Sequence, residues 1–336
     1  MVTMRDVATA ANVSTATVSR VIANKPHVRE DVRKTVRAVI DQLGYRPNLV
    51  AQNLRARQSK IIGLIVSDIQ NPFFRYISRA VEDTAHQNGY SVILCNNDEN
   101  PDKERMYLQL MQDQNIAGII LSPTIKASKQ FDDILSLNIP LAVIDRRVTG
   151  FDVDNIFIDN VSLAEKAVTH LCENGYQRIA GVFGDGSTTG KERHQGYLNA
   201  LKNAGLLVSK ELVRFVGPRE ETGHRAGMEF LQSRQPPDAV FTSNSLLAAG
   251  VMQAILDKNL SIPEQIGLAT FDDTSWTKLV TPAITVVDQP AYEIGQAATD
   301  LLIQRIKTPE RPTREIILKG KLIIRQSSLG SQKTAE

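Results

Sequence analysis

The sequence predicts a two-part protein, an all-α helix-turn-helix head followed by an α/β body built from two doubly wound parallel-sheet subdomains. Three observations lead to this fold class. In the first 45 residues, short amphipathic helical patterns are joined by a turn of helix-turn-helix length. From Ile61 onward, short apolar runs alternate with amphipathic helical stretches, as in buried parallel strands joined by helices. The charge divides at the same point, because residues 1–60 carry +7 and the rest of the chain −5.

The head contains signals for three helices. A capping box headed by Thr3 begins the first helix. Ser14 is a suitable N-cap for a second helix over residues 15–23, and a third is expected over 30–43. Gly44 supplies a stop for the third helix. The first two helices and their turn therefore predict a helix-turn-helix unit.

The second helix of such a unit enters the DNA major groove by its N-terminal end. Thr15, Ala16 and Arg20 are then directed at base edges, where Arg20 can donate two hydrogen bonds to guanine. We expect phosphate contacts from the surrounding short polar side chains, namely Thr3, Ser14, Thr17, Ser19, Asn24 and His27. The alternative is a three-helix module that binds another protein. The exposed face of the head argues against this, because it would consist of small polar side chains and arginines, with no apolar patch for a protein partner.

Residues 48–60 are expected to form a hinge helix and linker. Asn48 is a cap after Pro47, and about two helical turns can follow, a length that is marginal in water without a docking surface. Leu54 beside Arg55 fits an apolar wedge in a minor groove, flanked by phosphate contacts. The expected minor-groove residues are Asn48, Val50, Ala51, Leu54 and Arg55. The alternative is a linker turn packed on the body.

The run DVATAANVSTATVSRVIANK followed by LGYRPNLVAQNLR resembles the N-terminal signature of the lactose-repressor/galactose-repressor (LacI/GalR) family. Family order continues to about Arg325. The resemblance implies a transcriptional regulator whose operator affinity is controlled by a small effector, with a body of periplasmic-binding-protein-like architecture. It also implies a dimer whose paired hinge helices form on operator DNA. By position, Thr15, Ala16 and Arg20 match the family's base readers, and Leu54 matches its minor-groove wedge.

The resemblance suggests the following organisation: a DNA-binding domain over 1–47, a hinge over 48–60, an effector-binding and dimerisation domain over 61–330, and a flexible tail over 331–336. Within the body, subdomain 1 is expected at about 61–160 and 290–320, and subdomain 2 at about 161–288 and 321–330. Residues 327–336 are polar and contain no leucine heptads, which favours a dimer over a tetramer and a pseudo-palindromic operator.

Polar residues gather directly after the expected strands of the body, where α/β sheets bind ligands. Each such stretch alone fits a routine loop or helix cap. Together, however, acids, Arg, amides and an aromatic suit a polyhydroxylated ligand. The resemblance places Phe73, Asp145, Arg146, Arg193, Asn244, Asp272 and Gln289 at effector-pocket positions, and Trp276 at an aromatic position common in sugar-responsive members.

The cations near these positions bear on the ligand's class. A ligand with only neutral hydroxyls does not require as many cationic side chains as lie near these positions, namely Arg146, Arg147, Lys191 and Arg193. The forked guanidinium group of arginine matches the geometry of a carboxylate. With the resemblance of residues 272–295 to sugar-acid-responsive members of the gluconate/ketogluconate kind, this favours a sugar acid. A neutral pentose or hexose, or a sugar phosphate, is the alternative, with some cations facing solvent or a dimer partner. Purine-responsive members are expected to be less similar, because an aromatic that stacks on the base there falls at Arg146 here.

Other classes of protein fit less well. Residues 184–192 resemble a phosphate-binding loop, but Asp185 and Glu192 stand where glycine and a hydroxyl are required. No nucleophile, metal-ligand or cofactor motif is found, so we expect no enzyme, metal or cofactor. No membrane-length apolar run or export leader is evident, which favours a cytoplasmic protein without membrane contact over a periplasmic-type sugar binder. A sugar-modifying enzyme is the third alternative.

Overall fold

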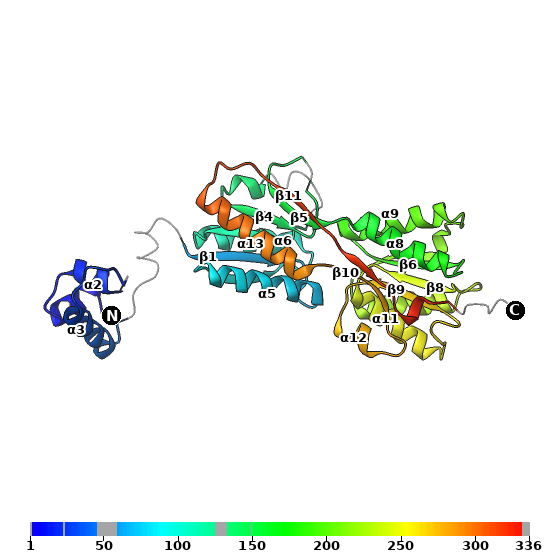
Figure 1. Cartoon of the computed structure of the whole chain (residues 1–336), viewed down its shortest axis with the longest axis horizontal. Helices are drawn as coiled ribbons and strands as arrows, with labels where there is room; N and C mark the ends of the chain where they lie inside the picture. Colours follow the sequence, from blue (N-terminus) through cyan, green and yellow to red (C-terminus); the bar gives the residue numbers. More distant parts are fainter. Residues whose placement is uncertain (1, 23, 46–58, 125–132, 149, 331–336) are drawn as a thin grey trace. The chain divides into compact units, whose positions relative to one another are not determined.

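The computed structural model describes residues 2–22, 24–45, 59–124, 133–148 and 150–330. Contacts divide the chain into two compact units, Met1–Ser59 and Lys60–Glu336, here called the head and the body. Figure 1 shows the helical head and the mixed α/β body. Among the described residues, none of the helices has the length and apolarity needed to cross a bilayer. Head and body together have the fold class that the sequence predicts.

The head consists of α1 (Met4–Ala10), α2 (Thr15–Ile22) and α3 (Glu30–Leu43). The capping box of Thr3 and the stop at Gly44, which has a φ of 60°, are both present. Ser14 Oγ accepts from the backbone N–H of Thr17 at 3.1 Å, so it caps α2 as expected. Val18 and Val36 are fully buried between the helices. The sequence therefore specifies the head through local caps and one apolar face per helix.

The first lobe of the body is built on a six-stranded parallel sheet in the order β11-β5-β4-β3-β1-β2. The strands are β1 (Ile61–Val66), β2 (Ser91–Asn96), β3 (Gly118–Leu121), β4 (Leu141–Ile144), β5 (Asp154–Ile158) and β11 (Glu315–Leu318). Helices α5 (Pro72–Gln87) and α13 (Ala291–Lys307) pack together on one face, and α6 (Pro101–Asp113) contacts β1 and β2. The central strands are apolar and buried on both faces, which is why they read as continuous apolar runs.

The second lobe repeats this layout with the order β12-β10-β9-β8-β6-β7. Its strands are β6 (Ile179–Gly184), β7 (Val213–Val216), β8 (Ala239–Thr242), β9 (Gly267–Phe271), β10 (Thr285–Asp288) and β12 (Lys321–Ile323), and short η1 (Lys210–Leu212) and η2 (Gln326–Ser328) turns adjoin the sheet. Helices α8 (Asn160–Glu173) and α9 (Thr188–Asn203) pair with each other, as do α10 (Glu220–Leu231) and α11 (Ser245–Asp257), and α12 (Ser275–Leu279) follows β9. Among the described strands, β12 departs from the predicted parallel pattern, because it pairs antiparallel with β10.

Two contacts show how closely the helices of the second lobe approach. A Cβ atom added at Gly250 of α11 would lie 2.0 Å from the carbonyl oxygen of Glu220 on α10. One added at Gly196 of α9 would lie 2.2 Å from the carbonyl oxygen of Val161 on α8. Both glycines are therefore required by backbone-to-backbone packing.

The chain passes between the two lobes three times, from β5 to α8, from β10 to α13 and from β11 to β12 (Figure 1). The first two passages leave from strands that lie one place in from an edge. In the first sheet β5 lies next to the edge strand β11, and in the second β10 lies next to the edge strand β12. The space between the lobes is bordered by residues that directly follow parallel strands of both sheets. The carboxyl ends of parallel strands are where α/β proteins bind ligands.

Candidate functional site

Two aspartates hold matching places in the two lobes. Asp145 follows β4 and Asp272 follows β9, and β4 and β9 are each the third strand of their sheets in the orders given above. Both residues have positive φ, 69° and 75°, and both are buried. The backbone N–H of each donates to a carbonyl of the next strand, at 3.0 and 2.9 Å. A strained backbone held in this way at a buried acid is typical of a binding site.

The two carboxylates differ in how they are held. Asp272 accepts from Gln289 Nε2 at 2.5 Å and from the backbone N–H of Ser245 at 3.2 Å. Among the described residues, Asp145 accepts one long hydrogen bond, 3.5 Å from Ser122 Oγ, and its other partner is the Arg146 guanidinium at 3.6 Å. Burial raises the pKa of Asp145 to about 6 although two arginines oppose this effect, and burial also raises the pKa of Asp272. Asp145 thus has the most unused acceptor capacity of the pair.

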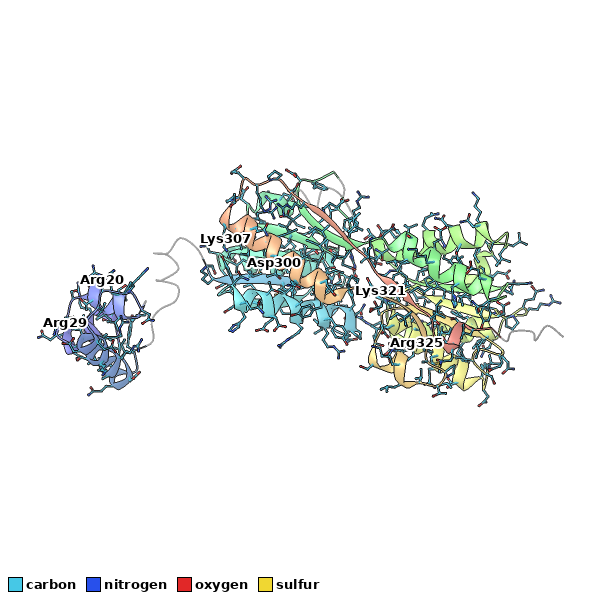
Figure 2. All side chains as sticks on the ribbon, viewed as in Figure 1. Arg20, Arg29, Asp300, Lys307, Lys321 and Arg325 are labelled. Atoms are coloured by element: carbon cyan, nitrogen blue, oxygen red, sulfur yellow. The ribbon has the colours of Figure 1, made fainter. Side chains whose placement is uncertain are left out.

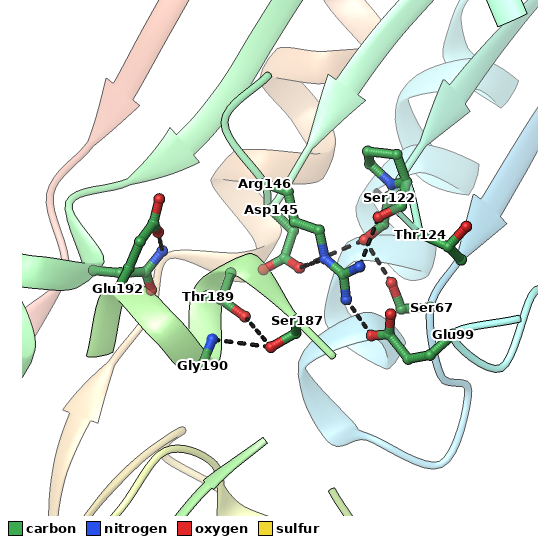
Figure 3. Close-up of polar contacts among 12 residues, drawn as sticks. Ser67, Glu99, Ser122, Thr124, Asp145, Arg146, Ser187, Thr189, Gly190 and Glu192 are labelled. Atoms are coloured by element: carbon green, nitrogen blue, oxygen red, sulfur yellow. Dashed lines mark hydrogen bonds and ion pairs between the residues drawn. The ribbon is translucent and has the colours of Figure 1, made fainter. Parts of the chain in front are cut away.

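Arg146 lies beside Asp145, with its Nε 3.6 Å from the Asp145 carboxylate (Figure 3). Its Nη1 donates to the carbonyl of Pro123 at 2.6 Å, and its Nη2 forms an ion pair with Glu99. Burial favours the neutral form of Arg146, but Glu99 and Asp145 outweigh it, so the net effect raises the pKa of this guanidinium. The Nε–H is buried and makes no hydrogen bond. Arg146 is therefore held between two carboxylates, Glu99 and Asp145, at one side of the cleft.

Arg193 is the second arginine of the cleft. Its guanidinium stacks 3.8 Å above the Phe271 ring and donates to Asn160 Oδ1 at 2.8 Å, to the carbonyl of Ser243 at 2.5 Å and to Gln289 Oε1 at 3.2 Å. Burial lowers the pKa of Arg193, partly opposed by Asp272 and Asp145. Through Gln289, Arg193 also orients the Asp272 carboxylate. It therefore connects α8, β8 and the end of β10 under one side of the cleft.

Most of the predicted ligand residues do lie together. The following residues line one cavity of about 50 Å³ between the lobes: Asp68, Asn71, Phe73, Phe74, Glu99, Asp145, Arg146, Gly184, Ser187, Thr189, Gly190, Arg193, Pro218, Ser243, Asn244, Asp272 and Gln289. Asn244 caps α11 through its side-chain oxygen, which accepts from Leu247 N–H at 2.9 Å. A larger hollow of about 390 Å³ shares Phe73, Asp272 and Gln289 with this cavity, so the two adjoin.

Two predicted ligand residues do not lie in this cleft. Lys191 is exposed on α9, because two residues along a helix turn the side chain away from the face that carries Arg193. Trp276 lies on α12, packs against the core of the second lobe and borders a separate groove between α10 and α11. Arg147 also faces outward, where it pairs with Glu315 at 3.1 Å. Of the four cations that the sequence indicated, the described cleft lining therefore contains only Arg146 and Arg193.

The sequence missed three charged residues at the cleft. Glu99 follows β2, and Asp68 follows β1 in one of the polar stretches expected at the cleft, although Asp68 itself was not assigned to the ligand. Arg219, at the N-terminus of α10, forms an ion pair with Asp68 across the two lobes. The sequence shows that Glu99 and Asp68 follow strands and that Arg219 precedes a helix. The spacing of the three residues, however, matches no known motif.

The predicted DNA-reading residues of the head lie on its surface. Thr15, Ala16 and Arg20 are exposed along α2, and Figure 2 shows the Arg20 side chain projecting from the head. Of the expected phosphate contacts, Ser14 and His27 are exposed and Thr17 and Ser19 are half-buried. Thr3 and Asn24 are exposed but already bonded within the head, Thr3 to Asp6 at 2.7 Å and Asn24 to Arg33 at 2.7 Å. The predicted hinge residues Asn48, Val50, Ala51, Leu54 and Arg55 lie outside the described residues.

In the described part of the chain, no group of three or more His, Cys, Asp or Glu side chains is arranged to hold a metal ion. One His–hydroxyl contact there joins His170 Nε2 and Ser328 Oγ at 2.8 Å, and it is buried beside β10 rather than in the cleft. Ser328 Oγ also lies 2.5 Å from Thr285 Oγ1. This cluster is accounted for by the packing of η2.

Comparison with known proteins gives two family matches that together cover most of the chain. The family described as "Bacterial regulatory proteins, lacI family" matches residues 3–48. The family described as "Periplasmic binding proteins and sugar binding domain of LacI family" matches residues 59–326.

Individual relatives match over nearly the whole length. The ribose operon repressor of Halalkalibacterium halodurans is 34% identical over 338 residues, covering 99% of each chain. The transcriptional repressor PurR of Serratia proteamaculans is 33% identical over 334 residues, covering 97% of each. The crystal structure of the lac repressor dimer bound to operator and an anti-inducer superposes with a TM-score of 0.86 at 26% identity, covering 98% of this chain and 99% of that one.

Proposed function

Because the chain belongs to the LacI family of bacterial regulatory proteins, it is a DNA-binding transcriptional regulator, and we propose that a small neutral sugar bound in the interlobe cleft controls its affinity for operator DNA. We propose further that it is a repressor of a carbohydrate catabolic operon and acts as a homodimer on a pseudo-palindromic operator. The dimeric, operator-bound lac repressor supports the last point.

The observation that carries the proposal is the convergence of Asp145 and Asp272 from equivalent strand ends on one cleft. Carboxylates accept hydrogen bonds from sugar hydroxyls, and Arg193 and Asn244 add donors next to them. Phe73, buried in the same lining, offers an apolar face. The combination suits a small molecule with several hydroxyl groups.

The charge of the cleft favours a neutral ligand over the sugar acid expected from the sequence. Its lining contains four carboxylates and two arginines, both already hydrogen-bonded within the protein. The comparisons do not confirm a sugar-acid branch either. Identity does not choose between sugars and purines, because the ribose operon repressor and PurR are 34% and 33% identical to this chain. The expectation that purine-responsive members are less similar is therefore not supported over the whole chain, and we base the choice on the cleft.

For the head, we propose that Thr15, Ala16 and Arg20 contact bases, with Thr3, Ser14, Thr17, Ser19, Asn24 and His27 near phosphates. We assign residues 1–47 to DNA binding, 48–60 to the hinge, and 61–330 to effector binding and dimerisation. The hinge residues Leu54 and Arg55 remain proposed minor-groove contacts. We further propose that the protein catalyses no reaction, since its relatives are regulators.

The function is tested with the purified full-length chain in two steps. An operator is first selected from random palindromes, and its affinity is then measured by fluorescence anisotropy while D-ribose and other neutral pentoses and hexoses are added. We expect one of these sugars to change operator affinity by at least about tenfold, a typical coupling between two sites. Lys191→Gln is the matched control, because this cation faces away from the cleft, and it should respond like the wild type. A protein that selects no palindrome, or whose selected operator responds to no neutral sugar, would contradict the proposal.

A further inference from the structure

We propose that Glu99 is a specificity residue that makes the interlobe cleft reject anionic ligands, because its carboxylate occupies the side of Arg146 that would otherwise bind one. The inference rests on the proposed function, since it concerns the ligand class of the same cleft. Glu99 is absent from the residues that the sequence predicted for this site, and its role follows from its contacts.

The backbone after β2 is shaped to present Glu99. Asp98 and Glu99 have consecutive positive φ angles, 51° and 56°, which are unfavourable for residues with a side chain. Asn97 is fully buried and holds the turn, because its Oδ1 accepts from the Glu99 N–H at 3.1 Å. The Asn97 Nδ2 in turn donates to Glu104 and to the carbonyl of Ser122, both at 3.1 Å. An unfavourable turn fixed from within directs the carboxylate into the cleft.

The guanidinium of Arg146 is the group that Glu99 covers (Figure 3). An arginine fork in a cleft binds a carboxylate or phosphate through two parallel hydrogen bonds. In Arg146, however, Nη1 is bonded to Pro123 and Nη2 is paired with Glu99. The side chain is only 3% exposed, and its Nε–H has no hydrogen-bond partner. Each terminal nitrogen of the fork therefore already has an acceptor, and Nε lies beside the Asp145 carboxylate, so an anion could reach two parallel donors only by displacing one of these groups.

The remaining charges of the cleft act in the same direction. Asp145 lies on the other side of Arg146, and Asp272 faces Arg193. A ligand carboxylate would meet these two acids and would have to displace Glu99 from its ion pair. A neutral sugar is not repelled by these acids and does not have to displace Glu99, because its hydroxyls can donate hydrogen bonds to the same carboxylates.

The test compares Glu99→Gln with a matched control, Glu315→Gln, in the full-length chain. Glu315 forms an ion pair with Arg147 at 3.1 Å, and Arg147 directly follows Arg146 in the sequence but faces outward. Glu315→Gln therefore removes one negative charge from beside an arginine that lies outside the cleft. The probes are D-gluconate, inorganic phosphate and D-ribose at constant ionic strength. Their binding is measured by the shift in melting temperature and by calorimetry. We expect D-gluconate or phosphate to bind Glu99→Gln at least about tenfold more tightly than the wild type or Glu315→Gln.

Several results would overturn the role of Glu99. One is a wild type that binds D-gluconate as tightly as Glu99→Gln does, and another is a Glu99→Gln protein that gains no affinity for either anion. Glu99→Asp keeps the charge and should restore rejection, so anion binding by Glu99→Asp equal to that of Glu99→Gln would also overturn it. If Glu99→Gln loses its native circular dichroism, Glu99→Ala is judged by the same criteria.

The proposed function fails in a different way. It fails if no neutral sugar binds the wild type, whereas a gain of anion binding confined to Glu99→Gln would still support the role of Glu99.

Discussion

Replacing Asp145 with asparagine should make the protein more stable at neutral pH. The pKa of this buried carboxyl is raised from 3.8 to about 6 in the folded protein. A tenfold change in proton affinity between the unfolded and folded states corresponds to about 1.4 kcal/mol, so ionised Asp145 costs the folded state up to about 3 kcal/mol. Because the folded pKa is the higher one, the stability linked to the protonated carboxyl is fully present below about pH 4 and is lost as the pH rises through 6. The Asp145→Asn protein has no carboxyl at this position, so its stability does not decrease with rising pH for this reason.

The assay is urea unfolding of both proteins between pH 4 and pH 7.5. The difference in free energy of unfolding between Asp145→Asn and the wild type should grow by up to about 3 kcal/mol across this range, mostly between pH 4 and 6. Asp272, whose pKa burial also raises, is present in both proteins. Asp102→Asn is the control, because the Asp102 side chain is 86% exposed on α6 and its replacement removes a carboxylate from the surface instead of from the cleft. A pH-independent difference for Asp145→Asn would refute the reasoning, and a gain in stability that accompanies weaker sugar binding would identify Asp145 as a group kept for function.

Three further substitutions test other parts of the molecule. Arg20→Ala should weaken operator binding by about 1–3 kcal/mol in anisotropy titrations while salt-sensitive binding to random DNA persists, and an unchanged operator preference would contradict the groove assignment. Asp272→Asn should abolish the thermal shift caused by the sugar that protects the wild type, so equal titrations would count against the cleft. Gly250→Ala should lower the free energy of unfolding by about 1–3 kcal/mol, because its Cβ would lie 2.0 Å from the Glu220 carbonyl oxygen. Gly217→Ala, which has open space around it, is the control and should unfold at the wild-type urea concentration.

The sequence predicts the central strands and the helices well, because their signals are local. Strands such as β1 and β3 are continuous apolar runs, and helices such as α8 begin at a visible cap, here Asp159. The edge strands β7, β11 and β12, whose residues are only partly buried, have no such run. An edge strand has one neighbour and one exposed side, so it does not need a continuous apolar run, although the edge strand β2 has one.

The candidate site was predictable to the extent that topology fixes it. Asp145 and Asp272 follow buried strands, and parallel sheets bring such strand ends to one edge. Lys191 and Trp276 lie outside the cleft lining because the direction of a side chain depends on helix phase and on packing within a lobe, which a strand-end rule does not contain. Glu99 was missed because its place depends on two left-handed residues in a turn that no sequence motif marks.

The three passages of chain between the lobes affect how the body is assembled during synthesis. Neither lobe is a continuous stretch of sequence, since the first sheet needs β11 and the second needs β12. A nascent chain that has reached α13 has ten of the twelve described strands, but each sheet still lacks an edge. Residues 315–323 then complete both sheets almost simultaneously. We therefore expect the body to become resistant to protease only after this segment has left the ribosome. The head is continuous in sequence, so it is complete early in translation, once its residues have been synthesised.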